Sequence, residues 1–285
     1  MDYKLFTEKS INYLTSYIER NKLQSLVLGI SGGIDSTVVA ALASIACKKT
    51  GAKLIGRSLP AHTNNPDEIN TATLVGQAFC DDFKEVAIEK MYAKVADEME
   101  LNEGKMNTLQ LGNIKARLRM MYLYNLASIH RGCVLDTDNR TEHELGFWTI
   151  HGDVGDLNCG LIYLWKTEVY ELANYLANEA SGLTQEQRIA LKESIKLIPT
   201  DGNGVMSGGD CAQFGLDNYS QVDDVLKTMY FPENGMDNIK YKEEYIRLID
   251  TYNEQGVDKV MTLHQNSMFK RLPQPIFPTK KELGL

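Results

Sequence analysis

A short apolar run that leads directly into two adjacent glycines is the feature that most constrains how this chain of 285 residues folds. Residues 26–30 form the run, Gly32 and Gly33 follow it, and residues 38–43 have the apolar spacing of a helix. This order predicts a strand that ends at a glycine turn, with a helix beginning immediately after it. Because glycine has no Cβ, a ligand can approach the backbone closely, and the free N–H groups of the first helical turn attract anions. The turn is therefore predicted to bind phosphate.

Strand-like and helix-like segments alternate along the chain on both sides of this turn. Further strands are predicted at 52–59, 83–88 and 133–135, and helices at 7–21, 66–79, 107–131, 166–179 and 184–193. Such alternation is typical of an α/β fold with a doubly wound parallel sheet and helices on both faces. The segment 147–165, which contains several glycines, is predicted to be a structured loop. We expect a single domain over residues 1–285, with a parallel-sheet core at about 22–180, a lid-like segment at 194–217 and a helical C-terminal part at 218–272.

The composition narrows the class of partner. The net charge of −8 argues against a nucleic-acid-binding surface, which needs clustered Lys and Arg. The five cysteines are widely spaced and never form a CxxC pair, so we expect free thiols instead of disulfides or a zinc site. The N-terminus has no signal-peptide pattern and no uncharged apolar run approaches the ~20 residues that span a bilayer. We therefore expect a cytoplasmic protein that binds neither nucleic acid nor a membrane.

The glycine turn differs from the two common nucleotide-binding motifs. No Lys follows the glycines as in GxxxxGK[ST], and their spacing does not fit GxGxxG. The pattern Ser-Gly-Gly-x-Asp-Ser after a strand resembles the loop of the ATP pyrophosphatases, which cleave ATP between the α and β phosphates. An ordinary capped glycine turn is the alternative. The residues assigned to ATP in this loop are Gly29, Ser31, Gly32, Gly33, Asp35, Ser36 and Thr37.

Two later motifs indicate a family within that class. The segment Asn113–Met120 reads NIKARLRM and matches the NxKAR-x-RM helix of the ammonia-dependent NAD⁺ synthetases, while Thr137–Glu142 is similar to their GTDxxxE. Thr137 follows a predicted strand, so it should lie at the same sheet edge as the glycine turn, where ligands of parallel sheets bind. The chain resembles this family, with its adenine-nucleotide alpha-hydrolase-like fold, from the N-terminal helix to about Arg271. The resemblance implies that Arg117 contacts deamido-NAD, that Thr137 contacts ATP and that Glu142 binds Mg²⁺.

The segment Gly146–Asp156 corresponds to the family's GFFTKxGDGGxD, with departures. Ile150 stands where the family has a substrate-contacting lysine, and one residue is missing before Asp156. The resemblance implies that Asp156 contacts the substrate, and His151 is a candidate to replace the missing positive charge.

Further matches lie toward the C-terminus. The resemblance implies ATP contacts at Lys166 and Thr200, and Lys270 matches the first residue of the family's terminal Lys-Arg pair, which implies a substrate contact. Cys211 and Phe269 stand where the family usually has glutamate and histidine.

The resemblance implies an enzyme that adenylates the carboxylate of deamido-NAD with ATP and displaces AMP with ammonia. Asp35, Glu142 and Lys166 are the expected catalytic residues, with Asp35 and Glu142 as Mg²⁺ ligands. Glutamine-dependent members of the family carry an additional N-terminal amidase domain, whereas the loop strand here starts only about 25 residues into the chain, so free ammonia, or ammonia from a separate protein, is the expected donor. The family is homodimeric, and we expect the same here.

Two alternatives stay open at this point. One is another ATP pyrophosphatase that amidates a different nucleotide. The other is a non-catalytic ATP-binding module, which needs neither a second metal carboxylate nor a substrate-binding arginine.

Overall fold

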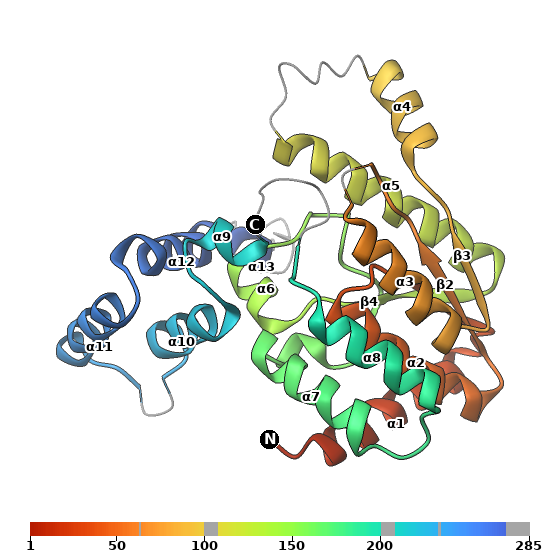
Figure 1. Ribbon diagram of the computed structural model, residues 1–285, viewed down its shortest axis with the longest axis horizontal. Helices are drawn as coiled ribbons and strands as arrows, with labels where there is room; N and C mark the ends of the chain where they lie inside the picture. The colour runs from red at the N-terminus through yellow and green to blue at the C-terminus, as the bar shows by residue number, and fades with distance from the viewer. Residues whose placement is uncertain (63, 100–107, 201–208, 233–234, 272–285) are drawn as a thin grey trace, which may run out of the picture.

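The computed structural model describes residues 1–62, 64–99, 108–200, 209–232 and 235–271. Its strands are β1 (Ser25–Gly29), β2 (Lys53–Ser58), β3 (Asp82–Glu85), β4 (Gly132–Asp136) and β5 (Leu157–Asn158). Its helices are α1 (Tyr3–Asn21), α2 (Ile34–Thr50), α3 (Pro66–Phe79), α4 (Glu89–Glu98), α5 (Thr108–Ile129), α6 (Arg140–Leu145), α7 (Lys166–Asn178), α8 (Gln185–Lys196), α9 (Asp210–Phe214), α10 (Tyr219–Tyr230), α11 (Asn238–Thr251), α12 (Glu254–Asn266) and α13 (Met268–Arg271), with a 3₁₀ turn at Leu161–Tyr163 (Figure 1).

The strands form one sheet in the order β3-β2-β1-β4-β5, and all four strand pairs are parallel. The chain leaves β1 toward β2 on one side and returns to β4 on the other. A crevice at the carboxyl ends of β1 and β4 is where such sheets bind ligands. The predicted doubly wound parallel sheet is confirmed, and the glycine turn after β1 lies at this crevice.

Alternate residues of β1 point to opposite faces of the sheet, and both faces are covered. Leu26 and Leu28 belong to the core cluster that contains α2, whereas Val27 belongs to the cluster that contains Met120 and Leu123 of α5. The helices on both faces, as predicted, explain why residues 26–28 of β1 are all apolar, because neither face meets water.

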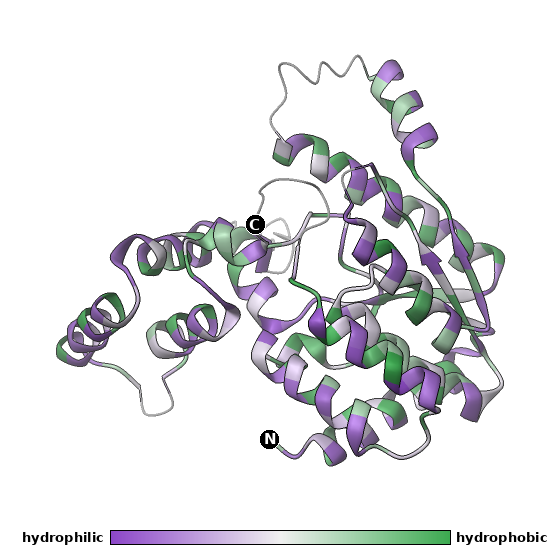
Figure 2. Ribbon diagram, viewed as in Figure 1, coloured by the Kyte–Doolittle hydropathy of each residue, from purple (hydrophilic) through white to green (hydrophobic). Residues whose placement is uncertain are grey.

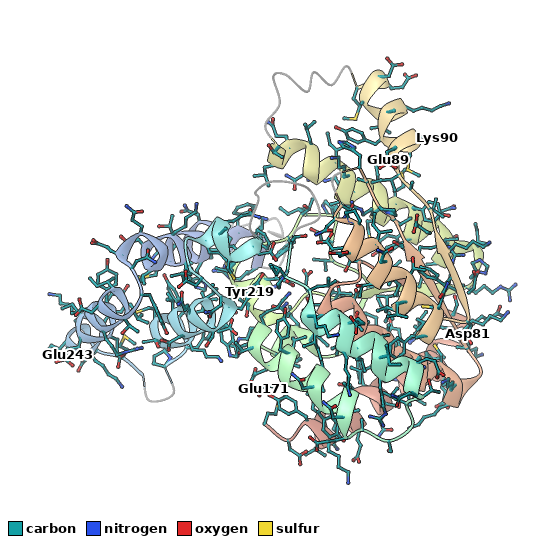
Figure 3. All side chains as sticks on the ribbon, in the orientation of Figure 1. Asp81, Glu89, Lys90, Glu171, Tyr219 and Glu243 are labelled. Atoms are coloured by element: carbon teal, nitrogen blue, oxygen red, sulfur yellow. The ribbon has the colours of Figure 1, made fainter. Side chains whose placement is uncertain are left out.

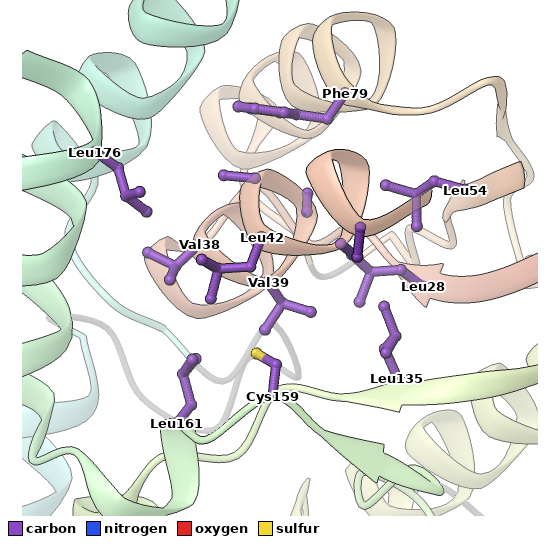
Figure 4. Packing of buried hydrophobic residues seen from close by; sticks show 14 of the residues in the cluster. Leu28, Val38, Val39, Leu42, Leu54, Phe79, Leu135, Cys159, Leu161 and Leu176 are labelled. Atoms are coloured by element: carbon purple, nitrogen blue, oxygen red, sulfur yellow. The ribbon is translucent and has the colours of Figure 1, made fainter. Parts of the chain in front are cut away.

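Helix α2 is the centre of the larger core. Ala40, Ala41, Leu42 and Ala43 are all fully buried, because the sheet lies on one side of α2 and α1, α7 and α8 lie around the rest. Figure 4 shows Val38, Val39 and Leu42 of this helix facing side chains of the strands and of the 157–161 segment, and in Figure 2 hydrophobic ribbon gathers around the same helix. A helix that is apolar all round is a buried helix. The site at its N-terminus is therefore rigidly held.

Helices α9, α10, α11 and α12 pack around a second apolar cluster, to which Phe214, Val222, Leu226 and Leu248 belong. Helices α10, α11 and α12 lie together at one side of the molecule in Figure 1, away from the sheet. Leu145 of α6 joins the same cluster, so α6 lies at the junction with the core. The predicted helical C-terminal part is present, and the extension of one domain over 1–285 stays a prediction.

Several sequence-based boundaries were wrong. The strand expected at 83–88 ends at Glu85, and α4 and α6 were not predicted. The loop expected at 147–165 contains β5, which has two residues and is too short to show an alternating pattern. The predicted lid 194–217 includes the end of α8 and all of α9, and its residues 201–208 lie outside the described part of the chain. No helix in the described ranges combines the length and apolar character needed to cross a membrane.

Candidate active site

A cavity of about 580 Å³ opens at the crevice between the carboxyl ends of β1 and β4. Its volume is in the range of small-molecule sites. The predicted site residues that line it are Gly29, Ser31, Gly33, Asp35, Ser36, Thr137, Glu142, Lys166, Thr200 and Lys270. The other predicted residues, Gly32, Thr37, Arg117, His151 and Asp156, are not among the described residues of its wall.

The glycine turn is held by its own hydroxyl groups. Ser31 Oγ and Ser36 Oγ are 3.0 Å apart, and the Gly33 N–H donates to Ser31 Oγ at 3.2 Å. Thr37 is fully buried, and its Oγ1 lies 2.9 Å from both the Gly33 carbonyl and Ser194 Oγ. Ser31 and Ser36 are thus placed to meet a ligand, whereas Thr37 ties the turn to α8.

Gly32 has a structural requirement of its own. Its φ of +86° lies in the left-handed region, and a Cβ there would lie 2.4 Å from the Glu68 carbonyl oxygen and 2.8 Å from the Ala72 nitrogen. Both are backbone atoms of α3, which cannot move aside as a side chain can. Glycine is needed here so that α3 can lie directly against the turn.

The three predicted catalytic side chains meet at the cavity floor. The Lys166 ammonium lies 2.6 Å from Asp35 Oδ2 and 2.8 Å from Glu142 Oε1. Lys166 is the first residue of α7 and is 3% exposed, whereas the Asp35 and Glu142 side chains are 15% and 16% exposed. Asn139, fully buried, donates to Asp35 Oδ1 at 2.8 Å and accepts from the Glu142 N–H at 3.1 Å. The Asn139 side chain therefore links the Asp35 carboxylate to the backbone of Glu142, and the Asn139 backbone N–H donates to Glu142 Oε2 at 3.4 Å.

Acidic groups outnumber cations around this floor. Burial raises the pKa of Glu142 to about 7. The positive charge of Lys166 lowers this pKa, and the negative charge of Asp35 raises it further. Burial and the neighbouring carboxylates, Asp136 first, raise the pKa of Asp138 well above its usual value, and its Oδ2 has no hydrogen-bond partner among the described residues. Burial acts to lower the pKa of Lys166, but Asp35 and Glu142 raise it well above normal. The site is therefore organised to attract positive charge.

Asp136, the last residue of β4, forms hydrogen bonds within the fold. Its carboxylate accepts from Asn158 Nδ2 at 2.9 Å and from the Asp138 N–H at 3.1 Å. It joins β5 to the end of β4 next to Thr137.

Helix α5 presents its motif residues in different directions. Asn113 accepts from Thr149 Oγ1 at 2.6 Å, and Arg119 donates to the Leu59 carbonyl at 2.9 Å, both inside the cavity. Arg117 is exposed and donates to the Ile150 carbonyl at 3.1 Å. The predicted substrate arginine thus lies on the outer surface beside the 146–156 loop.

That loop is fixed from the C-terminal side. Lys270 donates to the carbonyls of Gly146 and Trp148 at 2.7 and 2.5 Å. His151 is exposed with φ of +61°, which marks a turn. Asp156 accepts from Tyr124 at 2.8 Å and from the Val134 N–H at 3.2 Å, so its carboxylate is engaged with α5 and β4.

Thr200 closes one side of the cavity, where its hydroxyl is hydrogen-bonded to the Glu68 carboxylate of α3. Asn64, Glu68, Asn139 and Arg119 all belong to the site or its support, and sequence reasoning assigned none of them. Arg119 lies in the recognised helix motif and Asn139 lies within the Thr137–Glu142 motif, so these two had a signal in the sequence.

A protein-family model described as NAD synthase matches residues 6–274. The chain belongs to the NAD synthase family. Its curated relatives include an NH₃-dependent NAD⁺ synthetase of Pyrococcus furiosus, which is 30% identical over 280 residues, 98% of each chain.

Solved structures of NAD synthase relatives share the fold. The structure of NMN synthetase from Francisella tularensis has a TM-score of 0.75 at 25% identity and covers 98% of this chain and 99% of that one. The NH₃-dependent NAD synthetase of Campylobacter jejuni has a TM-score of 0.68 at 24% identity, with 98% and 100% coverage. A glutamine-dependent NAD⁺ synthetase of Acinetobacter baumannii matches 98% of this chain, which spans 47% of that longer one.

Proposed function

We propose that this NAD synthase homologue amidates the carboxylate of deamido-NAD with ammonia and uses ATP to do so. The observation that carries the proposal is the Asp35–Lys166–Glu142 cluster beside the glycine turn of a chain that matches NAD synthase over nearly its whole length. The carboxylate attacks the α-phosphorus, which forms an acyl adenylate and releases pyrophosphate. Ammonia then attacks the acyl carbon and releases AMP. The enzyme is a ligase that forms a C–N bond.

Mg²⁺ is the metal that the proposal includes, and the donor set fits it. Asp35 and Glu142 offer carboxylate oxygens, and the position between them already attracts the Lys166 ammonium. The described residues contain no group of three or more His, Cys, Asp or Glu side chains that could hold a metal, so phosphate and water oxygens would complete the shell, as is common for Mg²⁺. When bound, the ion neutralises phosphate charge and stabilises the departing pyrophosphate.

The chain's own residues bind and orient the reactants. The N–H groups at the start of α2, with the hydroxyls of Ser31 and Ser36, bind the pyrophosphate end of ATP. Lys166 adds a positive charge where negative charge develops, and Thr137 and Thr200, which both line the cavity, contact ATP. Residues 197–200 border the cavity and reduce the access of water to the adenylate. The remaining rate acceleration comes from holding the substrate carboxylate in line with the α-phosphorus of ATP.

A homodimer and a cytoplasmic location belong to the same proposal. Arg117 lies on the exposed side of α5, where Met121 is 58%, Tyr124 40% and Ile129 63% exposed. Large apolar side chains that gather on one exposed face mark an interaction surface. A second copy on α5 would cover them and would bring Arg117, with the loop that carries His151, to the edge of a shared deamido-NAD site. The five free cysteines fit a reducing compartment.

The test is incubation with Mg-ATP, ammonium and deamido-NAD, with NAD⁺, AMP and pyrophosphate all measured. We expect the three products in equal amounts, and no NAD⁺ when glutamine replaces ammonium. Release of ADP, or AMP formation that does not need deamido-NAD, would contradict the proposal. ATP binding without any turnover would favour a non-catalytic module instead.

A second candidate substrate is nicotinate mononucleotide, the acid that corresponds to NMN. The Francisella NMN synthetase has a TM-score of 0.75 with this chain, and Ile150 replaces a lysine that the family uses for the substrate. Supplying the mononucleotide in place of deamido-NAD in the same assay decides between them, since the preferred acid has the higher kcat/KM.

A further inference from the structure

Asp223 of α10 is a buried carboxylate that the mechanism above does not use. It is 1% exposed and is not among the described residues that line the cavity. Burying a carboxylate is costly unless hydrogen bonds compensate for the lost water. The hydrogen-bond partners of Asp223 therefore indicate its structural role.

These partners are residues directly next to two catalytic side chains. Thr141 Oγ1 donates to Asp223 Oδ1 at 2.5 Å, and the Thr167 N–H and hydroxyl donate to Oδ2 at 3.0 and 2.7 Å. Thr141 precedes Glu142 in α6, and Thr167 follows Lys166 in α7. One carboxylate thus holds the backbone on which Glu142 and Lys166 are mounted.

The first turn of α7 depends on this arrangement. Its N-cap residue is Trp165, whose side chain cannot accept a hydrogen bond. The free N–H of Thr167 is bonded by Asp223 instead, and the free N–H of Lys166 is bonded at 2.8 Å by Thr141 Oγ1, which Asp223 orients. A negative charge at a helix N-terminus also interacts favourably with the helix dipole. Asp223 therefore caps α7 from another part of the chain.

A second contact from α10 reaches the same lysine. The Lys166 ammonium lies 5.1 Å from the ring centre of Tyr219, and the Tyr219 hydroxyl donates to Asp210 Oδ2 at 3.0 Å. Figure 3 shows Tyr219 where the C-terminal helices meet the remainder of the molecule. Helix α10 thus supports Lys166 through both its backbone and its ammonium.

We propose that Asp223 is a positioning residue of the active site, which sets the relative placement of Lys166 and Glu142 by bonding Thr167 and Thr141. It acts through these residues and does not touch the reactants. The inference rests on the proposed function, because Lys166 and Glu142 are the groups that handle ATP and its metal there.

The test compares Asp223→Asn and Asp223→Ala with Asp224→Asn. Asp224 is the next residue of α10, and its carboxylate bonds Arg247 and Tyr252 within the C-terminal helices. Mutating a residue that hydrogen-bonds a metal ligand typically lowers metal affinity or activity by about 10- to 100-fold. We expect Asp223→Asn to lower kcat and raise the half-saturating Mg²⁺ concentration by about this factor, with Asp223→Ala at its upper end.

The KM for the acid substrate should stay within about twofold in all three variants, because that substrate is held elsewhere. Asp224→Asn should leave every kinetic constant within about twofold, as is usual for a surface ion pair. Circular dichroism and thermal melting measure the folded fraction of each variant, and rates are expressed per folded enzyme.

Two results would overturn the inference. One is Asp223→Asn with kcat and Mg²⁺ dependence within about twofold of the wild type. The other is a loss of activity that disappears once the folded fraction is taken into account. If the wild-type enzyme makes no amide at all, the proposed function fails, and calorimetric binding of Mg-ATP judges Asp223 separately. Equal Mg-ATP affinity in the wild type and Asp223→Asn then overturns the positioning role.

Discussion

Replacing Lys166 by Met removes one ammonium and keeps a side chain of similar length. That ammonium lies 2.6 Å from Asp35 Oδ2 and 2.8 Å from Glu142 Oε1, and Lys166 is itself 3% exposed. The variant therefore leaves two carboxylates side by side without the cation between them.

The cost follows from the burial of the three groups. Removing one partner of a buried ion pair costs about 3–5 kcal/mol, because the other charge is left uncompensated. Asp35 and Glu142 keep contact with water, at 15% and 16% exposure, so we expect a loss of about 3 kcal/mol in the free energy of unfolding. Turnover should fall by about 10²- to 10³-fold, the usual effect of removing one group that stabilises transition-state charge.

Urea denaturation measures the first quantity and single-turnover AMP release the second. In the variant, Mg²⁺ without nucleotide should raise the unfolding free energy more than it does in the wild type, since two unpaired carboxylates are available to it. Lys192→Met on the exposed side of α8 is the matched control, and it should change neither quantity. An unchanged stability together with wild-type turnover would refute the role given to Lys166, and an equal Mg²⁺ effect in both proteins would refute the placement of the metal.

Three further predictions concern single residues. Asp35→Asn should lower turnover by about 10²-fold or more, because a metal carboxylate is lost, while the circular dichroism spectrum is unchanged. Gly32→Ala should cost about 2–4 kcal/mol in urea denaturation, since the φ of +86° is strained for Ala and the new Cβ would meet the Glu68 carbonyl and the Ala72 nitrogen of α3. Burial, and then the charge of Arg271, lower the pKa of His264 to about 4, so the unfolded chain, with a His pKa of about 6.5, binds the proton first as pH falls, and stability should decrease between these values. In His264→Gln that part of the pH dependence should be absent from the urea midpoints.

Each of these three predictions has a control or an outcome that would contradict it. Asp67→Asn, at an exposed position of α3, should keep full turnover, and a similar loss there would make the Asp35 result nonspecific. Gly51→Ala has a φ of +77° but open space around its Cβ, so it should cost only about 1 kcal/mol. If both glycine variants are equally unstable, close packing of α3 on the turn is not the reason. A His264→Gln protein that loses stability with acid as steeply as the wild type would show that other groups cause the loss.

The parts of the fold that could be predicted are those with a repeating local signal. Residues 26–28 of β1 are all apolar because both sheet faces are covered, and α3 begins at Pro66 with an Asn65 cap, so its bounds agree with the prediction. The two residues of β5 and the six of α6 are too few for any period to appear. Their existence depends on neighbours that are distant in the sequence.

The candidate site also contains residues that the sequence could predict and residues that it could not. Asp35, Glu142 and Lys166 could be predicted to meet, because each lies in a recognisable motif and the parallel sheet gathers such motifs at one edge. The direct contact of the Lys166 ammonium with both carboxylates was not predicted, and the Mg²⁺ expected at Asp35 and Glu142 stays a prediction. The contact of Asn139 with Asp35 could not be predicted, because a cap residue beside an acid looks like ordinary helix chemistry until Asp35 is seen within 2.8 Å of it.

The capping of α7 by α10 also affects how the site forms during synthesis. Asp223 lies 56 residues after Thr167 and 82 after Thr141 in the chain. A growing chain therefore completes the sheet and the glycine turn well before the carboxylate that orders Lys166 and Glu142 leaves the ribosome, and such long-range contacts form late in folding. We therefore expect the ability to split ATP to appear only after α10 has been synthesised and has packed against α6 and α7.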